Sequence, residues 1–110
     1  MIVVLSVFLQ FKIRRMNLGK VISDLRKKKN LTQLELAEKC KMTQAYLSHI
    51  ENNKKDPHIT TLKEISKALE IPLPIIFFLS MDEDDVPDDK KELSSFLFKN
   101  FKPILENNYI

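Results

Sequence analysis

Apolar residues recur at intervals of three and four along most of this 110-residue chain, and that spacing places side chains on one face of an α-helix. The first such stretch starts directly after Met16 and stops at Asn30. Four more follow at short intervals, and a last one begins after residue 92. The pattern predicts helices over about 17–29, 33–40, 44–52, 61–69, 73–81 and 93–110.

Small polar residues mark where these helices begin and end. Thr32, with Glu35 three positions later, has the spacing of a capping box, and Thr43 is placed to cap the next helix. Asn30 and Asn53 stand where helices should end, and asparagine tolerates the left-handed conformation used there. The second and third helices are therefore expected to be short and joined by only a few residues.

Threonine and proline mark the later boundaries. Thr61 and Glu64 could form another capping box, which would start the fourth helix near Thr61. Pro74 is tolerable only in the first turn of the fifth helix, and Pro103 should kink or stop the last one. The apolar positions of that last helix are Leu93, Phe96, Leu97 and Phe101.

The composition favours an all-α fold. Glycine occurs once, and the Asn-Gly and Asp-Gly pairs typical of β-hairpins do not occur in the sequence. The single cysteine, Cys40, excludes an intrachain disulfide and is expected in the core as an inert thiol, which suits a reducing compartment such as the cytoplasm. The sequence contains no zinc-type spacing, phosphate loop or nucleophile–base pair. We therefore expect no metal, no cofactor and no enzymatic activity.

Charge divides the chain into a basic part and an acidic part. Residues 12–67 carry 14 Lys and Arg against 6 Asp and Glu, whereas residues 68–110 carry 4 against 9. A basic body indicates a polyanionic partner. Six carboxylates crowd the eight residues from Asp82 onward, which predicts a solvated linker. We therefore expect a domain over 16–81, an acidic linker over 82–92 and a C-terminal helix over 93–110.

Residues 1–15 form an apolar extension that ends in basic residues. Its apolar run of eleven residues is too short to cross a bilayer, which needs roughly 20. The charges also follow the run, whereas in a secretory signal they precede it. No membrane association is therefore expected. Three explanations stay open: a short strand, an arm that packs on the domain or on a partner, or an extension upstream of a start at Met16.

Two short helices joined by three or four residues make a helix-turn-helix. The second helix can enter a DNA major groove about 12 Å wide, where residues at its N-terminal end meet base edges. Glutamine can bond bidentately to adenine, and Gln44 opens this helix. The exposed side of the helix is expected to carry short or amide-bearing residues with no acid among them, namely Gln44, Ala45, Ser48 and His49.

Three motifs follow one another at fixed spacing: "LTQxELA" from Leu31, "TxxYLSxIE" from Thr43 and "PxxxTLxxIxxAL" from Pro57. Together they resemble the helix-turn-helix domain of the lambda repressor and Cro superfamily, also called the XRE family, from Leu18 to Leu79. The resemblance implies a five-helix domain that binds double-stranded DNA, usually as a dimer on a palindromic operator. It makes a repressor of transcription the leading hypothesis.

The resemblance also implies roles for individual residues. Gln44, Ala45 and His49 would face base edges, with Ser48 and Tyr46 at the boundary between bases and backbone. The residues expected to face phosphates are Gln33, Thr43, Tyr46, Asn52, Lys54 and Lys55.

The resemblance also implies an ion pair, and the sequence departs from the family pattern at two positions. Arg26 matches an arginine that in many members pairs with the glutamate of the second motif, here Glu51. Lys41 stands in the turn where the family usually has glycine, and a left-handed non-glycine residue costs roughly 1 kcal/mol. Asn53 stands at a second position where glycine is frequent, and asparagine should serve there.

The C-terminal third carries more apolar surface than a helix pair should expose. The last helix either folds back on its own domain or forms a dimer interface, and we favour the dimer. The candidate interface residues are Phe78, Leu79, Phe96, Leu97 and Phe101. The alternative function is an antitoxin that represses its own operon and holds a protein partner, a toxin, through this segment. A weaker alternative is a coregulator that bridges proteins without reading DNA.

Overall fold

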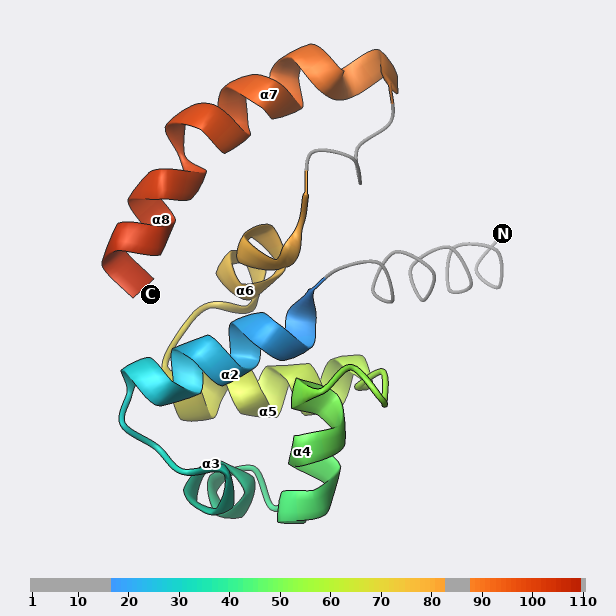
Figure 1. The fold of residues 1–110 in the computed structure, drawn as a ribbon, viewed down its shortest axis with the longest axis vertical. Helices are drawn as coiled ribbons and strands as arrows, with labels where there is room; N and C mark the ends of the chain where they lie inside the picture. Colours follow the sequence, from blue (N-terminus) through green and yellow to red (C-terminus); the bar gives the residue numbers. More distant parts are fainter. Residues whose placement is uncertain (1–16, 83–87, 110) are drawn as a thin grey trace.

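The computed structural model describes residues 17–82 and 88–109 of the chain. These residues form helices and no strands (Figure 1). The elements are α2 (Leu18–Lys28), α3 (Gln33–Lys39), α4 (Gln44–Glu51), α5 (Ile59–Leu69), α6 (Leu73–Ser80), η2 (Asp88–Lys90), α7 (Lys91–Asn100) and α8 (Lys102–Tyr109). The fold is thus all-α, as predicted. The apolar extension and most of the acidic linker lie outside the described residues.

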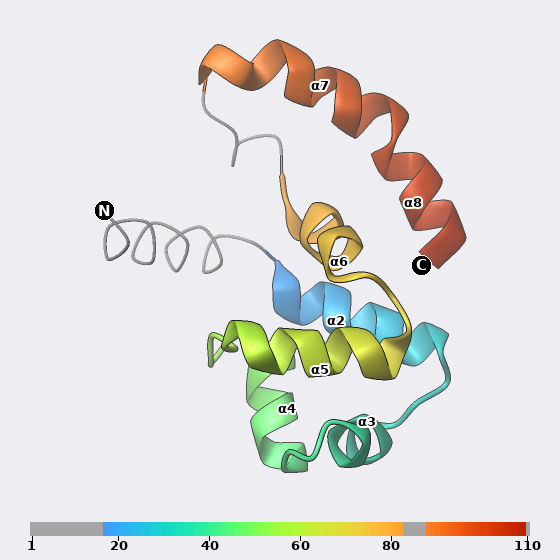
Figure 2. The same cartoon turned by 180° about the vertical axis from the view of Figure 1, so that it is seen from behind.

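Helices α2 to α6 make up the predicted five-helix domain. In both views α2 and α5 cross the middle of this domain, with α3 and α4 on one side of them and α6 on the other (Figures 1 and 2). Helices α7 and α8 lie beyond α6, on the side away from α3 and α4. The fully buried large side chains of the core come from every one of these five helices: Ile22, Leu25, Leu36, Leu47, Ile50, Leu62, Ile65, Leu69 and Ile76.

The ends of α2 to α5 share one geometry. Each helix is followed by a non-glycine residue with φ near +58°, namely Asn30, Lys41, Asn53 and Glu70. In every case the N–H of this residue reaches the carbonyl three residues back, and the next N–H reaches the carbonyl five residues back. This is the bonding of a Schellman motif, which satisfies the last carbonyls of a helix. The left-handed ends expected at Asn30 and Asn53 are confirmed.

Helix beginnings follow the sequence prediction at two places and depart from it at a third. Thr32 and Glu35 form a complete capping box, and Thr43 Oγ1 accepts a hydrogen bond from Tyr46 N at 3.1 Å. The capping box expected at Thr61 and Glu64 was wrong, because α5 already begins at Ile59. Thr61 therefore lies inside the first turn and has no helix N-terminus to cap.

The C-terminal segment forms two helices that fold back on α6. The break at Phe101 precedes Pro103, whose ring would clash with the carbonyl four residues earlier in a continuous helix. The Phe98 ring stacks on Phe78 of α6 at 5.3 Å between centroids. Lys102 Nζ donates to the Met81 carbonyl at 2.8 Å and lies 5.2 Å from the centre of the Phe98 ring. The predicted kink is present, and the contact with α6 is that of the fold-back alternative, which we did not favour from the sequence.

Among the residues that the structure describes, no helix is both long and apolar enough to cross a membrane.

Candidate DNA-binding surface

The turn between α3 and α4 contains the lysine that stands in place of glycine. Lys41 has a φ of 57°, so its backbone adopts the left-handed conformation that glycine would adopt more easily. Met42 N bonds back to the Ala37 carbonyl at 3.0 Å, and the Met42 side chain packs against the core. The turn therefore keeps a regular Schellman geometry, and Lys41 carries its strain.

Helix α4 divides cleanly into a buried and an exposed face. Leu47 and Ile50 are buried in the core, and the Tyr46 side chain is half-buried against it. The side chains expected to face bases lie on the other side: Gln44, Ala45 and His49 are exposed, and Ser48 is half-buried. Positions 44, 45, 48 and 49 share one face because a helix repeats about every 3.6 residues. This face is free of negative charge.

The end of that face is held by hydrogen bonds within the helix. Asn52 Nδ2 donates to the Ser48 carbonyl at 2.9 Å and approaches Ser48 Oγ at 3.3 Å. The N–H groups of Lys54 and Lys55 both bond to the His49 carbonyl, at 2.8 and 3.3 Å. These contacts fix where the chain leaves α4, while the side chains of both lysines stay exposed.

Arg26 and Glu51 form a buried ion pair that joins α2 to the end of α4. Arg26 Nε donates to Glu51 Oε2 at 2.8 Å and Arg26 Nη2 donates to Oε1 at 3.0 Å, while the two residues are 8% and 9% exposed. Arg26 Nη1 also donates to the Leu31 carbonyl at 2.7 Å, one residue before the cap of α3. The ion pair expected from the sequence is therefore present, and it also ties the start of α3 to both other helices.

Gln33 takes part in the same cluster. Its Nε2 donates to Glu51 Oε1 at 3.0 Å, and the side chain is half-buried. The sequence predicts that Gln33 faces a phosphate, and it does not predict this contact with Glu51. Because the amide group carries two N–H donors, one can bond to Glu51 while the other faces outward. The phosphate role of Gln33 stays a prediction.

Cys40 lies at the end of α3, beneath the turn to α4. It is 7% exposed, and burial raises the pKa of its thiol, with a smaller contribution from the nearby Glu64 carboxylate. A thiol with a raised pKa is a poor nucleophile at neutral pH. Its surroundings therefore fit the structural role expected from the sequence.

The predicted dimer residues are divided between the core and the surface. Leu79 is 6% exposed and packs in the core of its own domain, so it offers no surface to a partner. Phe78 and Leu97 are half-buried, whereas Phe96 and Phe101 are 57% and 48% exposed. An apolar hollow of about 360 Å³ runs between α6 and the C-terminal helices, lined by Pro74, Ile75, Phe78, Leu97, Phe101 and Leu105. Leu93 and Ile104, the latter not foreseen, are also exposed.

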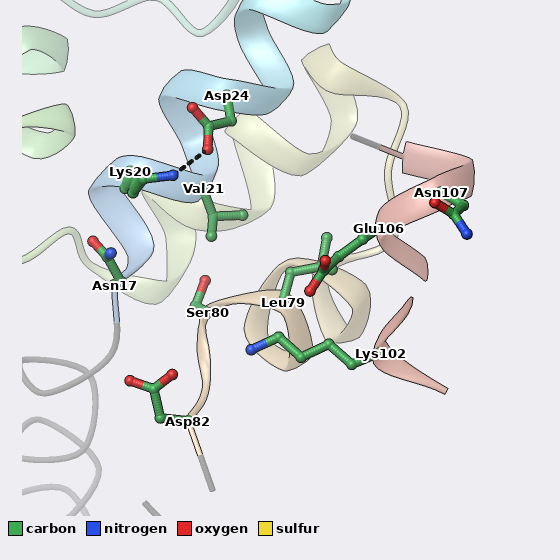
Figure 3. Close-up of a pocket in the computed structure, with 10 residues that line it drawn as sticks. All are labelled: Asn17, Lys20, Val21, Asp24, Leu79, Ser80, Asp82, Lys102, Glu106 and Asn107. Carbon is green, nitrogen blue, oxygen red and sulfur yellow. Dashed lines mark hydrogen bonds and ion pairs between the residues drawn. The ribbon is translucent and has the colours of Figure 1, made fainter. Parts of the chain in front are cut away.

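A second hollow, of about 410 Å³, lies between α2, the end of α6 and α8 (Figure 3). Its walls mix both signs of charge, and on one wall Lys20 pairs with Asp24 at 2.9 Å. In the described part of the chain, no cluster of His, Cys, Asp and Glu has the arrangement of a metal site. We assign no ligand to this hollow.

Gly19, the only glycine in the chain, was not recognised from the sequence as a functional position. It is buried in the first turn of α2, against the last turn of α4. A single glycine inside a helical pattern usually has a packing reason, and this was the signal available.

Comparison with known proteins shows the family. The pattern of a family described as Helix-turn-helix matches residues 22–76, which is half of the chain. The chain therefore belongs to this helix-turn-helix family.

Two phage proteins and one bacterial protein are similar to it. The immunity repressor protein of Bacillus phage phi105 is 38% identical over 61 residues, which are 56% of this chain and 42% of that protein. The ImmF control region 10 kDa protein of the same phage is 39% identical over 59 residues, 54% of this chain and 66% of that one. The chain thus spans less than two thirds of either phage protein. An uncharacterized HTH-type transcriptional regulator, y4dJ of Sinorhizobium fredii, is 36% identical over 53 residues, 48% of this chain and 69% of that protein.

A solved structure supports the fold. The crystal structure of the clp gene regulator ClgR from Corynebacterium glutamicum aligns with a TM-score of 0.61 and 22% identity, over 82% of this chain and 95% of that one. At this level of identity the likeness concerns the fold alone.

Proposed function

We propose that this protein is a sequence-specific repressor of transcription that reads a palindromic operator with α4 and acts as a dimer. The name of the phi105 immunity repressor, to which this chain is 38% identical over 61 residues, supports the repressor role. The names of the other two relatives, an ImmF control region protein and an uncharacterized HTH-type transcriptional regulator, agree with a regulatory role.

The observation that carries the proposal is the exposed face of α4. Its side chains are uncharged or basic, and the helix itself is held rigidly. Side-chain amides and imidazoles can donate to and accept from base edges, and an acid on this face would repel the phosphates. The cluster of Arg26, Glu51 and Gln33 holds the end of α4 against α2 and the start of α3. A helix fixed in this way meets the bases with little loss of freedom on binding.

Positive charge and helix N-termini around α4 supply the phosphate contacts of the proposal. The N-termini of α3 and α4 present backbone N–H groups and the positive ends of helix dipoles. The exposed Lys54 and Lys55 follow α4 directly, and Thr43 begins it. We assign phosphate contacts to these residues together with Gln33, Tyr46 and Asn52. Such contacts release counterions, so affinity should fall steeply with salt.

The exposed apolar side of α7 and α8 supplies the dimer surface of the proposal. Phe96, Phe101, Leu93 and Ile104 leave this side uncovered in one chain. Helices α7 and α8 lie on the far side of the domain from α4 (Figure 1). A dimer formed there would leave both copies of α4 uncovered, and two copies are what a palindromic operator requires.

Selection of bound duplexes from a random DNA pool tests the proposal. We expect a palindromic motif whose half-site centres are separated by about one helical turn, 10–10.5 base pairs, or a multiple of it. Enrichment of no motif would contradict sequence-specific reading. Enrichment of a single half-site would contradict the dimer while leaving the reading intact.

A further inference from the structure

We propose that Gly19 and Asn53 form a second attachment that orients α4, with Asn53 both ending α4 and capping α2. The inference rests on the proposed function, in which α4 reads DNA. It assigns to two residues a positioning role, since neither is among the residues expected to contact DNA.

Gly19 allows α2 and α4 to approach closely. A Cβ at this position would lie 2.5 Å from the Ile50 carbonyl oxygen and 2.7 Å from that of Glu51. Real Cβ atoms do not come within 3.0 Å of such atoms, and backbone carbonyls at a packed helix end cannot swing away. Any larger residue at position 19 must therefore push the last turn of α4 away from α2.

Asn53 has two structural roles, one for its backbone and one for its side chain. Its backbone, at a φ of 58°, closes the Schellman motif that ends α4. Its side-chain Oδ1 accepts a hydrogen bond from Gly19 N at 3.2 Å. That N–H belongs to the first turn of α2, where backbone donors have no partner within the helix. Asn17, at the N-cap of α2, provides no side-chain cap among the described residues, so Asn53 supplies one from 34 positions away.

The two attachments act at different points along α2. Arg26 holds Glu51 near the end of α2, and Gly19 receives Asn53 near its start. The two points are seven residues apart, which corresponds to about 10 Å along the axis of α2. Two contacts at this separation constrain the direction of α4 more than either contact does alone, in addition to the packing of Leu47 and Ile50 in the core. The direction of α4 determines where its base-facing side chains lie and where the lysines that follow Asn53 lie.

Glycine at position 53 would end α4 as well as asparagine does, or better, but it would not cap α2. The substitution Asn53→Gly therefore separates the positioning role from the helix end. Asn30→Gly is the matched control, because Asn30 has the same left-handed conformation at the end of another helix. The Asn30 side chain is exposed and makes no hydrogen bond within the described residues.

The test uses the full chain with two measurements. The first is the hydrogen-exchange rate of the Gly19 amide by NMR. The second is the ratio of affinities for a duplex recovered by the selection and for the same duplex with scrambled half-sites. Partial unfolding lowers both affinities equally and leaves their ratio unchanged, so a purely structural role would not alter this ratio.

For Asn53→Gly we expect faster exchange of the Gly19 amide, because its N–H loses its acceptor. We also expect the affinity ratio to fall about fivefold, because a less firmly held α4 presents its base-facing side chains less accurately. Asn30→Gly should change neither quantity. Unchanged exchange would overturn the capping role, and faster exchange with an unchanged ratio would overturn the positioning role. If the wild-type protein itself did not distinguish the two duplexes, the proposed function would fail first, and the inference would lose its basis with it.

Discussion

Arg26 and Glu51, 25 positions apart, meet through two hydrogen bonds of 2.8 and 3.0 Å in the interior of the domain. The pair links the first helix of the domain to the last residue of the helix that we assign to base recognition. Gln33, at the start of α3, donates a third hydrogen bond to the same carboxylate. The relative angle of α3 and α4 therefore depends on one carboxylate.

Removing one partner of this pair should be costly. We expect Arg26→Ala to lower the free energy of unfolding by about 3–5 kcal/mol, because Glu51 is then left buried and unpaired. The double variant with Arg26→Ala and Glu51→Ala should lose less than the sum of the two single variants, since no uncompensated charge remains. Urea unfolding at pH 7 measures all three. Small, additive losses would show that the pair does not hold α4.

The strained residues at helix ends predict stabilising substitutions. Lys41→Gly and Glu70→Gly should each raise the free energy of unfolding by up to about 1 kcal/mol, because glycine adopts the left-handed conformation without steric cost. Lys39→Gly, at the last helical residue of α3, is the control and should lower it, because the backbone there is helical and glycine has no left-handed conformation to relieve. Thermal melting compares the three variants. If Lys41→Gly were as destabilising as the control, the turn would not have the geometry described.

The capping box at the start of α3 predicts a pH dependence. Hydrogen bonds from the Thr32 backbone and side chain hold the pKa of Glu35 below its ordinary value of 4.5. A carboxyl group whose pKa is lower in the folded than in the unfolded state stabilises the fold above its unfolded pKa. That stabilisation is lost as the pH falls through the lower, folded pKa.

Glu35→Gln removes this titration and keeps a side-chain acceptor for the Thr32 N–H. The difference in unfolding free energy between wild type and Glu35→Gln should therefore be greatest above pH 4.5 and shrink below it. Urea unfolding between pH 3 and pH 7 measures this difference. This range is wide enough because a carboxyl titration is followed over about four pH units. A difference that grew on acidification would have the opposite sign and would rule out the capping contribution.

The exposed face of α7 and α8 predicts self-association. Sedimentation velocity of the full chain should show a dimer at micromolar concentration, and a variant with Phe96→Glu and Phe101→Glu should be a monomer, because charges would be buried in the interface. Lys99→Glu, an exposed change on the same helix, is the control and should leave the dimer intact. A monomeric wild type would instead favour the alternative prediction, a segment that binds a separate protein such as a toxin.

Features set by neighbouring residues could be predicted from the sequence. Thr32 and Glu35 are three positions apart, so their capping box depends on little else. Asn30 and Asn53 end helices because of their own backbone preference. The Arg26–Glu51 pair spans 25 positions and was expected only through the family resemblance.

Features that depend on packing between distant segments could not. The start of α5 at Ile59 escaped prediction, because Thr61 and Glu64 have capping-box spacing without standing at a helix start. Leu79 looks like surface in a long apolar run, and only the packing of α6 shows that it is core. Gly19 matters through carbonyl groups more than 30 positions away.

Binding of wild type and of a variant with Gln44→Ala and His49→Ala to a selected and a scrambled duplex tests the central claim, that α4 reads bases. Both side chains are exposed, so the substitutions should leave the fold and the thermal midpoint unchanged. Wild type should prefer the selected duplex by a factor of about 10³ or more. The variant should lose most of this preference while keeping its affinity for scrambled DNA, since phosphate contacts remain. A variant that keeps the wild-type preference would contradict the account, because residues other than Gln44 and His49 would then read the bases. A wild type without any preference would favour a coregulator that does not read DNA.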